Sequence, residues 1–303
     1  MQKIDKLEYP LVSIIILNWN GGVEYCIGAV KSAIEQDYPN KEIIFVDNAS
    51  TDGSYEAVQE LFEEITCVQT GGNFGCAGGR NIGVDAASGE LIFFLENDGV
   101  WPTNDIVSGI ANIFLQNPEI AALGLSVVLP EEDISNDDKN LYLAAYFPGG
   151  ASVHRRALFN EVGGFPYDFF IYYEESYMSY ILYDMGYVVV KCPEYSLIHY
   201  TSAYSGKSRI LILNTKVNIL KTIIRVFPAY IWPLIFLYKS ILCCRDLLKE
   251  SEPGLIYEMF KAVFFDKNKS IPVKRISWET LMKVREIRRN KMKFKRAETR
   301  DNI

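Results

Sequence analysis

The sequence lacks the patterns that mark several common protein classes. Neither GxGxxG nor GxxxxGK[ST] occurs among its 21 glycines, which disfavours a dinucleotide-binding dehydrogenase and a P-loop NTPase. Its six cysteines include no CxxC pair, so we expect reduced, mostly buried thiols instead of a zinc site or a disulfide framework. The first ten residues contain no apolar run and therefore predict no signal peptide.

Positive charge is scarce over most of the chain. The 303 residues carry 31 basic and 38 acidic side chains, for a formal net charge of -7, whereas nucleic-acid phosphates bind to positive surfaces. We therefore expect no nucleic-acid partner. The basic residues concentrate in a tail, because thirteen Lys and Arg stand against three Glu between Lys267 and Arg300.

The first half of the chain alternates apolar, β-branched runs with helical patterns, which is typical of a doubly wound α/β sheet. We predict strands at residues 12–17, 42–46, 66–70, 90–95, 121–129 and 188–192. Helices are predicted at 23–36, 54–64, 74–87 and 174–185, and from 208 to the C-terminus.

Polar residues follow three of the predicted strands. Asn18 ends the first strand, Asp47 the second, and Glu96-Asn97-Asp98 the fourth. Since ligands of such sheets bind beyond the carboxyl ends of the strands, these residues predict one site at one edge. Two acids two positions apart could hold a hard divalent cation that substrate phosphates complete; the alternative is an acidic turn that faces solvent.

Five segments in this order resemble glycosyltransferase family 2: residues 12–20, 45–53, 73–83, 87–98 and 163–165. The resemblance implies the GT-A fold, a doubly wound mixed α/β sheet with a Rossmann-like nucleotide-binding half and an acceptor half, over residues 1–205. Residues 206–303 would form a helical, basic C-terminal region. The similarity is greatest to rhamnosyltransferase-like bacterial members that build surface polysaccharides.

The resemblance also implies roles on the donor side of the site. The nucleotide-binding positions would be Asn18, Asp47, Asn73, Arg80 and Glu96. Asp47 would accept a hydrogen bond from a uracil or thymine imide, and Arg80 would offset phosphate charge. Asp98 and His199 would hold Mg²⁺ or Mn²⁺. The alternatives are a helix cap for Asp47, a surface helix residue for Arg80 and a structural role for His199.

On the acceptor side, Glu175 matches the general base, with Glu174 as the fallback. Tyr177 stands where the family usually has a further acid, and the alternative is that both glutamates only begin a helix. Gly149 and Gly150 would let the acceptor loop approach closely. A second histidine, at position 154, is expected at the surface beside two arginines.

Together these residues predict a metal-dependent, inverting transferase of the hexosyltransferase type, which moves a sugar from a UDP- or dTDP-sugar to a saccharide or lipid-linked saccharide. A non-catalytic nucleotide-sugar-binding scaffold is the alternative. We expect a cytoplasmic protein. Two interpretations of the uncharged, proline-containing stretch 226–238 stay open: peripheral contact with an anionic membrane, or a buried helical hairpin.

Overall fold

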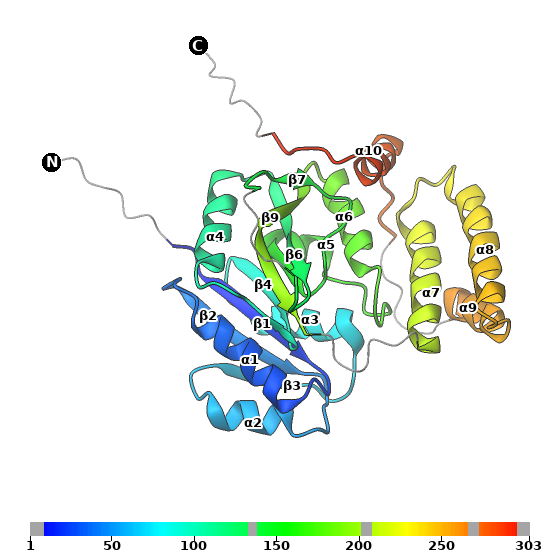
Figure 1. Cartoon of the computed structure of the whole chain (residues 1–303). Helices are drawn as coiled ribbons and strands as arrows, with labels where there is room; N and C mark the ends of the chain where they lie inside the picture. The colour runs from blue at the N-terminus through cyan, green and yellow to red at the C-terminus, as the bar shows by residue number, and fades with distance from the viewer. Residues whose placement is uncertain (1–8, 133–137, 201–207, 266–272, 296–303) are drawn as a thin grey trace, which may run out of the picture.

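The computed structural model describes residues 9–132, 138–200, 208–265 and 273–295. Its centre is a single mixed sheet with the strand order β3-β2-β1-β4-β8-β6-β9-β5, to which β7 adds by pairing with β9 (Figure 1). The strands are β1 (Val12–Asn18), β2 (Lys41–Asp47), β3 (Thr66–Gln69), β4 (Leu91–Glu96), β5 (Gly99–Val100), β6 (Ile120–Val128), β7 (Tyr142–Leu143), β8 (Ala151–Arg155) and β9 (Val188–His199).

The sheet combines a parallel half with a mixed half. Strands β1 to β4 pair in parallel, as the alternation of strands and helices predicts. Strand β8 then lies antiparallel to both β4 and β6, and β9 returns parallel to β6. The predicted strand 188–192 is correct but too short, because β9 continues to His199 and carries that side chain toward β5.

The apolar runs bury both faces of the sheet. Ile14 and Ile16 pack into one core cluster with helices α1, α2 and α4, whereas Ile15 and Leu17 pack into the other with α3, α5 and α6. Successive strand residues point to opposite faces, so a continuous apolar run is what a doubly covered sheet requires. These helices are α1 (Val23–Ile34), α2 (Ser54–Leu61), α3 (Gly75–Ala86), α4 (Ile106–Gln116), α5 (Arg156–Val162) and α6 (Glu174–Asp184).

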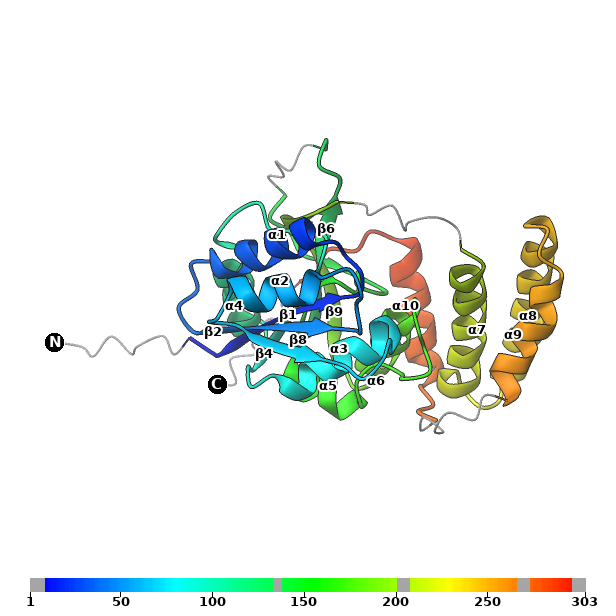
Figure 2. The ribbon, with the colours of Figure 1, turned by 90° about the horizontal axis from the view of Figure 1, so that it is seen from below.

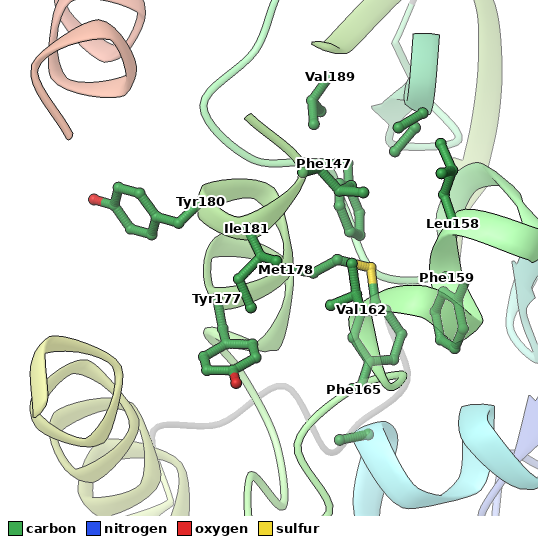
Figure 3. Packing of buried hydrophobic residues seen from close by; sticks show 14 of the residues in the cluster. Phe147, Leu158, Phe159, Val162, Phe165, Tyr177, Met178, Tyr180, Ile181 and Val189 are labelled. Carbon is green, nitrogen blue, oxygen red and sulfur yellow. The ribbon is translucent and has the colours of Figure 1, made fainter. Parts of the chain in front are cut away.

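Between α5 and α6 the core is rich in aromatic and sulfur-containing side chains. Figure 3 shows Phe159, Val162, Phe165 and Met178 pointing toward one another in this space. All four are less than 5% exposed. This packing fixes α6, which begins with two glutamates, against the body of the sheet.

Four helices follow the α/β body: α7 (Arg209–Val226), α8 (Trp232–Lys249), α9 (Gly254–Phe265) and α10 (Trp278–Arg289). Helix α7 lies between the body and the α8–α9 pair (Figure 2), and α10 packs against α6. The predicted helix from 208 to the C-terminus is therefore wrong at its end. The described residues after α10 are not helical but run beside β7, where Lys293 forms a β-bridge with Tyr142. The predicted domain boundary at 205/206 lies outside the described residues and stays a prediction.

The stretch 226–238 is buried only in part, since Val226 and Phe227 lie in the core whereas Tyr230 and Tyr238 are exposed. Although α8 packs with α7 and α9 around Leu220 and Leu247, its outer face exposes Leu234, Leu237 and Ile241 by 60% or more. Within the described residues, no helix has the length and apolar character needed to cross a bilayer.

Candidate active site

The parallel pairing brings the predicted strand-end residues to one edge. Asn18 stands opposite Asp47 across β1 and β2, and Leu17 stands opposite Glu96 across β1 and β4. The structure therefore confirms that the polar residues after these strands gather at one edge of the sheet, because parallel strands in this register end side by side.

Asn18 ties the strand ends together. Its side chain is fully buried; its Nδ2 donates to Asp47 Oδ1 at 3.0 Å and to Ser54 Oγ at 2.7 Å, and its Oδ1 accepts from Asn97 Nδ2 at 2.8 Å. Asp47 is buried as well, and its second oxygen accepts from the Ser50 backbone at 3.1 Å. One amide therefore orients the carboxylate of Asp47 and the turn after β4 at the same time.

Asn73 organises the turn before α3. Its Oδ1 accepts from Asn48 Nδ2 at 3.0 Å and from the Gly75 backbone at 2.8 Å. Asn48 in turn accepts the Phe74 backbone N–H at 3.0 Å. These bonds orient the N-terminus of α3, where backbone N–H groups and the helix dipole favour an anion.

Arg80 forms the centre of a charged cluster and is not a surface residue. It is 3% exposed; its guanidinium lies 3.0 Å from Glu96 Oε1 and 3.5 Å from Glu174 Oε1. Burial alone would lower the pKa of Arg80, but the surrounding acids, Glu96 foremost, raise it. The guanidinium therefore stays charged and holds carboxylates from β4 and α6 in one place.

The two predicted glycines close this cluster from the loop before β8. A Cβ on Gly150 would lie 1.9 Å from the Glu96 carboxyl group, and one on Gly149 would lie 2.8 Å from both Arg80 and Glu175. A side chain at either position would displace the charged groups. The loop backbone consequently packs closely against Glu96, Arg80 and Glu175.

Glu174 and Glu175 are adjacent, and the pKa of each is raised. Burial, followed by the charge of Glu175, raises the pKa of Glu174, which is 1% exposed. Its Oε2 has no hydrogen-bond partner among the described residues. Burial also raises the pKa of Glu175, against the opposing attraction of Arg80. Carboxyl groups whose pKa is raised toward neutrality suit proton transfer.

Asp98 and His199 form a separate pair beside this cluster. Asp98 Oδ1 lies 3.0 Å from His199 Nε2, because β5 and the end of β9 pair antiparallel and place Gly99 opposite His199. The hydrogen bond with Asp98 raises the pKa of His199, against the opposing effect of burial. A carboxylate and an imidazole suit a divalent cation. The described residues contain no group of three such side chains, so substrate oxygens would have to complete the shell.

His154 contradicts the sequence-based expectation of a surface position. It is 1% exposed and its ring lies 4.5 Å from that of Phe147 and 5.4 Å from that of Phe94. Burial, with the charge of Arg80, lowers its pKa to about 3. The error arose because the neighbouring arginines suggested solvent, whereas the inward direction of position 154 depends on the register of β8.

The sequence reasoning also missed residues that support the site. Asn97 was noted only as part of an acidic turn, yet it binds Asn18. Ser54, at the start of α2, accepts from the same amide. No local pattern distinguishes such side chains from ordinary turn and capping residues, because their partners lie far away along the chain.

The mixed α/β sheet with helices on both faces, and the polar cluster at its strand ends, are those of the GT-A class of glycosyltransferase fold. Solved structures support this assignment. A Pyrobaculum calidifontis mannosyltransferase, PcManGT, in complex with GDP-Man and Mn²⁺ superposes with a TM-score of 0.57 over 92% of this chain and 80% of its own, at 21% identity. S. aureus TarS in complex with UDP-GlcNAc gives a TM-score of 0.59 over 84% and 72%, at 14% identity.

The sequence profile described as Glycosyl transferase family 2 matches residues 13–180, so the chain belongs to glycosyltransferase family 2. A curated Escherichia coli relative, UDP-Glc:alpha-D-GlcNAc-diphosphoundecaprenol beta-1,3-glucosyltransferase WfaP, is 37% identical over 33% of this chain and 40% of its own. The putative teichuronic acid biosynthesis glycosyltransferase TuaG of Bacillus subtilis is 36% identical over 30% and 37%. The chain thus spans about two fifths of the length of these relatives.

Proposed function

We propose that this protein is a metal-dependent, inverting glycosyltransferase of surface polysaccharide synthesis, with a UDP- or dTDP-sugar as donor. The observation that carries the proposal is the Arg80 cluster, in which one guanidinium lies within 3.5 Å of the donor-side Glu96 and of Glu174 on α6, next to the proposed base Glu175. A saccharide or lipid-linked saccharide is the proposed acceptor, since the E. coli relative carries a diphosphoundecaprenol-linked acceptor in its name. A rhamnosyl group is one proposed donor sugar.

On the donor side, Asp47, oriented by Asn18, would read the imide of the base. Asn73 and the N-terminus of α3 would bind the diphosphate, and the buried Arg80 would offset its negative charge. Asp98 and His199 are the residues that would hold Mg²⁺ or Mn²⁺, which when bound neutralises the diphosphate leaving group. The Pyrobaculum mannosyltransferase binds its GDP-Man together with Mn²⁺, which supports this choice of ion.

On the acceptor side, Glu175 would remove the proton of the attacking hydroxyl. The hydroxyl oxygen then bonds to the anomeric carbon from the face opposite the diphosphate, and the bond from that carbon to the diphosphate oxygen breaks. A single in-line displacement inverts the centre. Gly149 and Gly150 let the loop before β8 pack directly against Glu96, Arg80 and the proposed base Glu175, and Glu174 beside it keeps one oxygen without a hydrogen-bond partner among the described residues.

We expect purified protein to release nucleoside diphosphate from a UDP- or dTDP-sugar in the presence of Mn²⁺, and to lose that activity in EDTA. Asp98→Asn should raise the Mn²⁺ concentration needed, because one of two protein ligands is weakened. Product analysis by ion-exchange chromatography separates nucleoside diphosphate from pyrophosphate. Full activity in EDTA would contradict the metal dependence, and released pyrophosphate would indicate nucleotide transfer instead.

The alternative of a non-catalytic nucleotide-sugar-binding scaffold has one specific observation in its favour. Tyr177, at the position of a family acid, is 2% exposed and packs its ring against Phe169, so it offers no carboxylate to the site. Binding of UDP or dTDP by calorimetry without turnover, even with a membrane lipid extract as acceptor source, would favour the scaffold.

We further propose that the outer face of α8 contacts an anionic membrane, where a lipid-linked acceptor would lie. Leu237→Ser combined with Ile241→Ser should weaken binding to phosphatidylglycerol-containing vesicles by more than about 100-fold, because each apolar side chain contributes roughly 1.5–3 kcal/mol when buried. Vesicle flotation measures this, with Leu115→Ser, also exposed but on α4, as the control. Wild-type protein that stays with the solvent fraction, or that only self-associates through this face, would contradict the proposal.

A further inference from the structure

Residues 163–173 form the loop that leads into the two glutamates, and the nucleotide half of the protein already holds one side of it. Asn81 on α3 donates to the Phe165 carbonyl at 2.8 Å and accepts the Phe165 N–H at 2.9 Å. The Cys76 N–H donates to the Phe170 carbonyl at 2.7 Å. These hydrogen bonds involve Phe165 and Phe170, and none of them reaches the last residues of the loop, just before Glu174.

Those last residues have an uncommon backbone conformation. Tyr172 and Tyr173 have φ of 68° and 77°, in the left-handed region that residues with a Cβ seldom occupy. Such a conformation persists only where the surrounding structure holds it. Tyr173 is also the N-cap of α6, so its backbone sets the direction in which Glu174 and Glu175 leave the helix.

Helix α7, in the C-terminal region, supplies hydrogen bonds to these last residues. The side-chain Nδ2 of Asn218, which is fully buried, donates to the carbonyls of Ile171 at 3.0 Å and Tyr172 at 2.7 Å. Its Oδ1 accepts no hydrogen bond from the described residues. The side chain therefore serves as a donor to two successive carbonyls of the loop.

A second contact from the same face of α7 fixes the middle of the loop. Both carboxylate oxygens of Asp168 accept hydrogen bonds from the Arg225 guanidinium, at 2.9 and 2.7 Å. The Lys221 ammonium lies 2.8 Å from the same carboxylate. The spacing of residues 218, 221 and 225 places all three side chains on one side of the helix. Helix α7 is thus attached to the loop at two points.

We propose that Asn218 is a positioning residue for sugar transfer, which fixes the start of α6 and with it the carboxylates of Glu174 and Glu175. This inference rests on the proposed function. It assigns to the C-terminal region a part in forming the active site, in addition to the proposed membrane contact. Removal of the amide would free two carbonyls at the strained turn and let the base move away from the acceptor hydroxyl.

The test is Asn218→Ala in the full chain. We expect kcat to fall about 10- to 100-fold, since a misplacement of about 1 Å has an effect of that order, while the donor KM and the Kd for UDP or dTDP stay unchanged. Hydrogen exchange measured by mass spectrometry should become faster in residues 170–174. A variant with wild-type kcat and wild-type exchange would overturn the proposal.

Two variants of the same helix serve as controls. Leu220→Ala removes a buried side chain that packs toward α8 and α9, so it should lower stability without changing kcat. Thr222→Val replaces a buried hydroxyl without a partner in the described chain and should be neutral. An equal loss of kcat in Leu220→Ala would reduce Asn218 to a structural role and overturn the proposal. If the wild type binds the donor without turnover, the proposed function fails. Hydrogen exchange in wild type and Asn218→Ala still tests whether Asn218 fixes residues 170–174.

Discussion

Glu175→Gln should lower the transfer rate about 10²- to 10⁴-fold, the contribution of a well-placed general base. Gln is nearly isosteric and keeps the packing at the start of α6, but it cannot accept the proton of the acceptor hydroxyl. The Kd for the donor should not change, because the groups proposed to bind the nucleotide lie on β1, β2, β4 and α3 and in the turn before α3, and not on α6. Single-turnover transfer with calorimetry on the same samples measures both quantities.

The matched control is Glu174→Gln. Glu174 Oε1 lies 3.5 Å from the Arg80 guanidinium, and burial raises the pKa of Glu174 and so favours its neutral form. The neutral amide of Gln should therefore be tolerated, with a smaller loss of rate than in Glu175→Gln. If Glu174→Gln abolishes transfer and Glu175→Gln does not, the two roles are exchanged. Retention of full activity in both variants would exclude either glutamate as the base.

The pH dependence of transfer follows from the same pair. A general base acts in its ionised form, and burial raises the pKa of Glu175 above the usual value for glutamate. The rate should therefore rise with pH through this elevated pKa, so that the acid limb lies above the ordinary range near 4.5. Loss of that limb in Glu175→Gln, measured as residual rate against pH, would assign it to this residue.

Asp168→Asn is expected to have the largest effect on stability, about 3–5 kcal/mol. Its carboxylate is 3% exposed and pairs with Lys221, at 4%, and Arg225, at 15%. The amide would remove the negative charge with which both largely buried cations pair. Urea unfolding followed by circular dichroism measures the change, and a loss below about 1 kcal/mol would show that water already solvates the cluster.

Asp246→Asn provides the comparison, because that acid is 36% exposed and pairs with Lys216 of α7 and with its exposed neighbour Arg245. Its loss should change stability by less than about 0.5 kcal/mol. Burial acts to raise the pKa of Asp168, but hydrogen bonds from Arg225 and Lys221 lower it below its usual value. The stabilisation is thus present above the ordinary pKa of an aspartate and is lost as the pH falls through the lowered one.

The prediction of the fold succeeded where one contiguous segment carries the information. The run of residues 12–17 has no polar interruption except Ser13, and only a strand covered on both faces buries such a run. The site edge followed from the same segments, because Asn18 and Asp47 come directly after their strands. Strands β5, β7 and β8 and helices α4 and α5 were not predicted, since short or mixed segments lack a clear period.

The sequence by itself therefore determined the family, the parallel half of the sheet and the edge at which its polar residues gather, since each depends on residues close together in the chain. Only the tertiary structure decided that Arg80 binds Glu174, 94 positions away, that His154 lies inside an aromatic cluster, and that Asn218 holds the turn before α6. Burial and pairing of polar groups arise from contacts between distant segments, and no local pattern encodes which distant partner a buried charge or amide will meet.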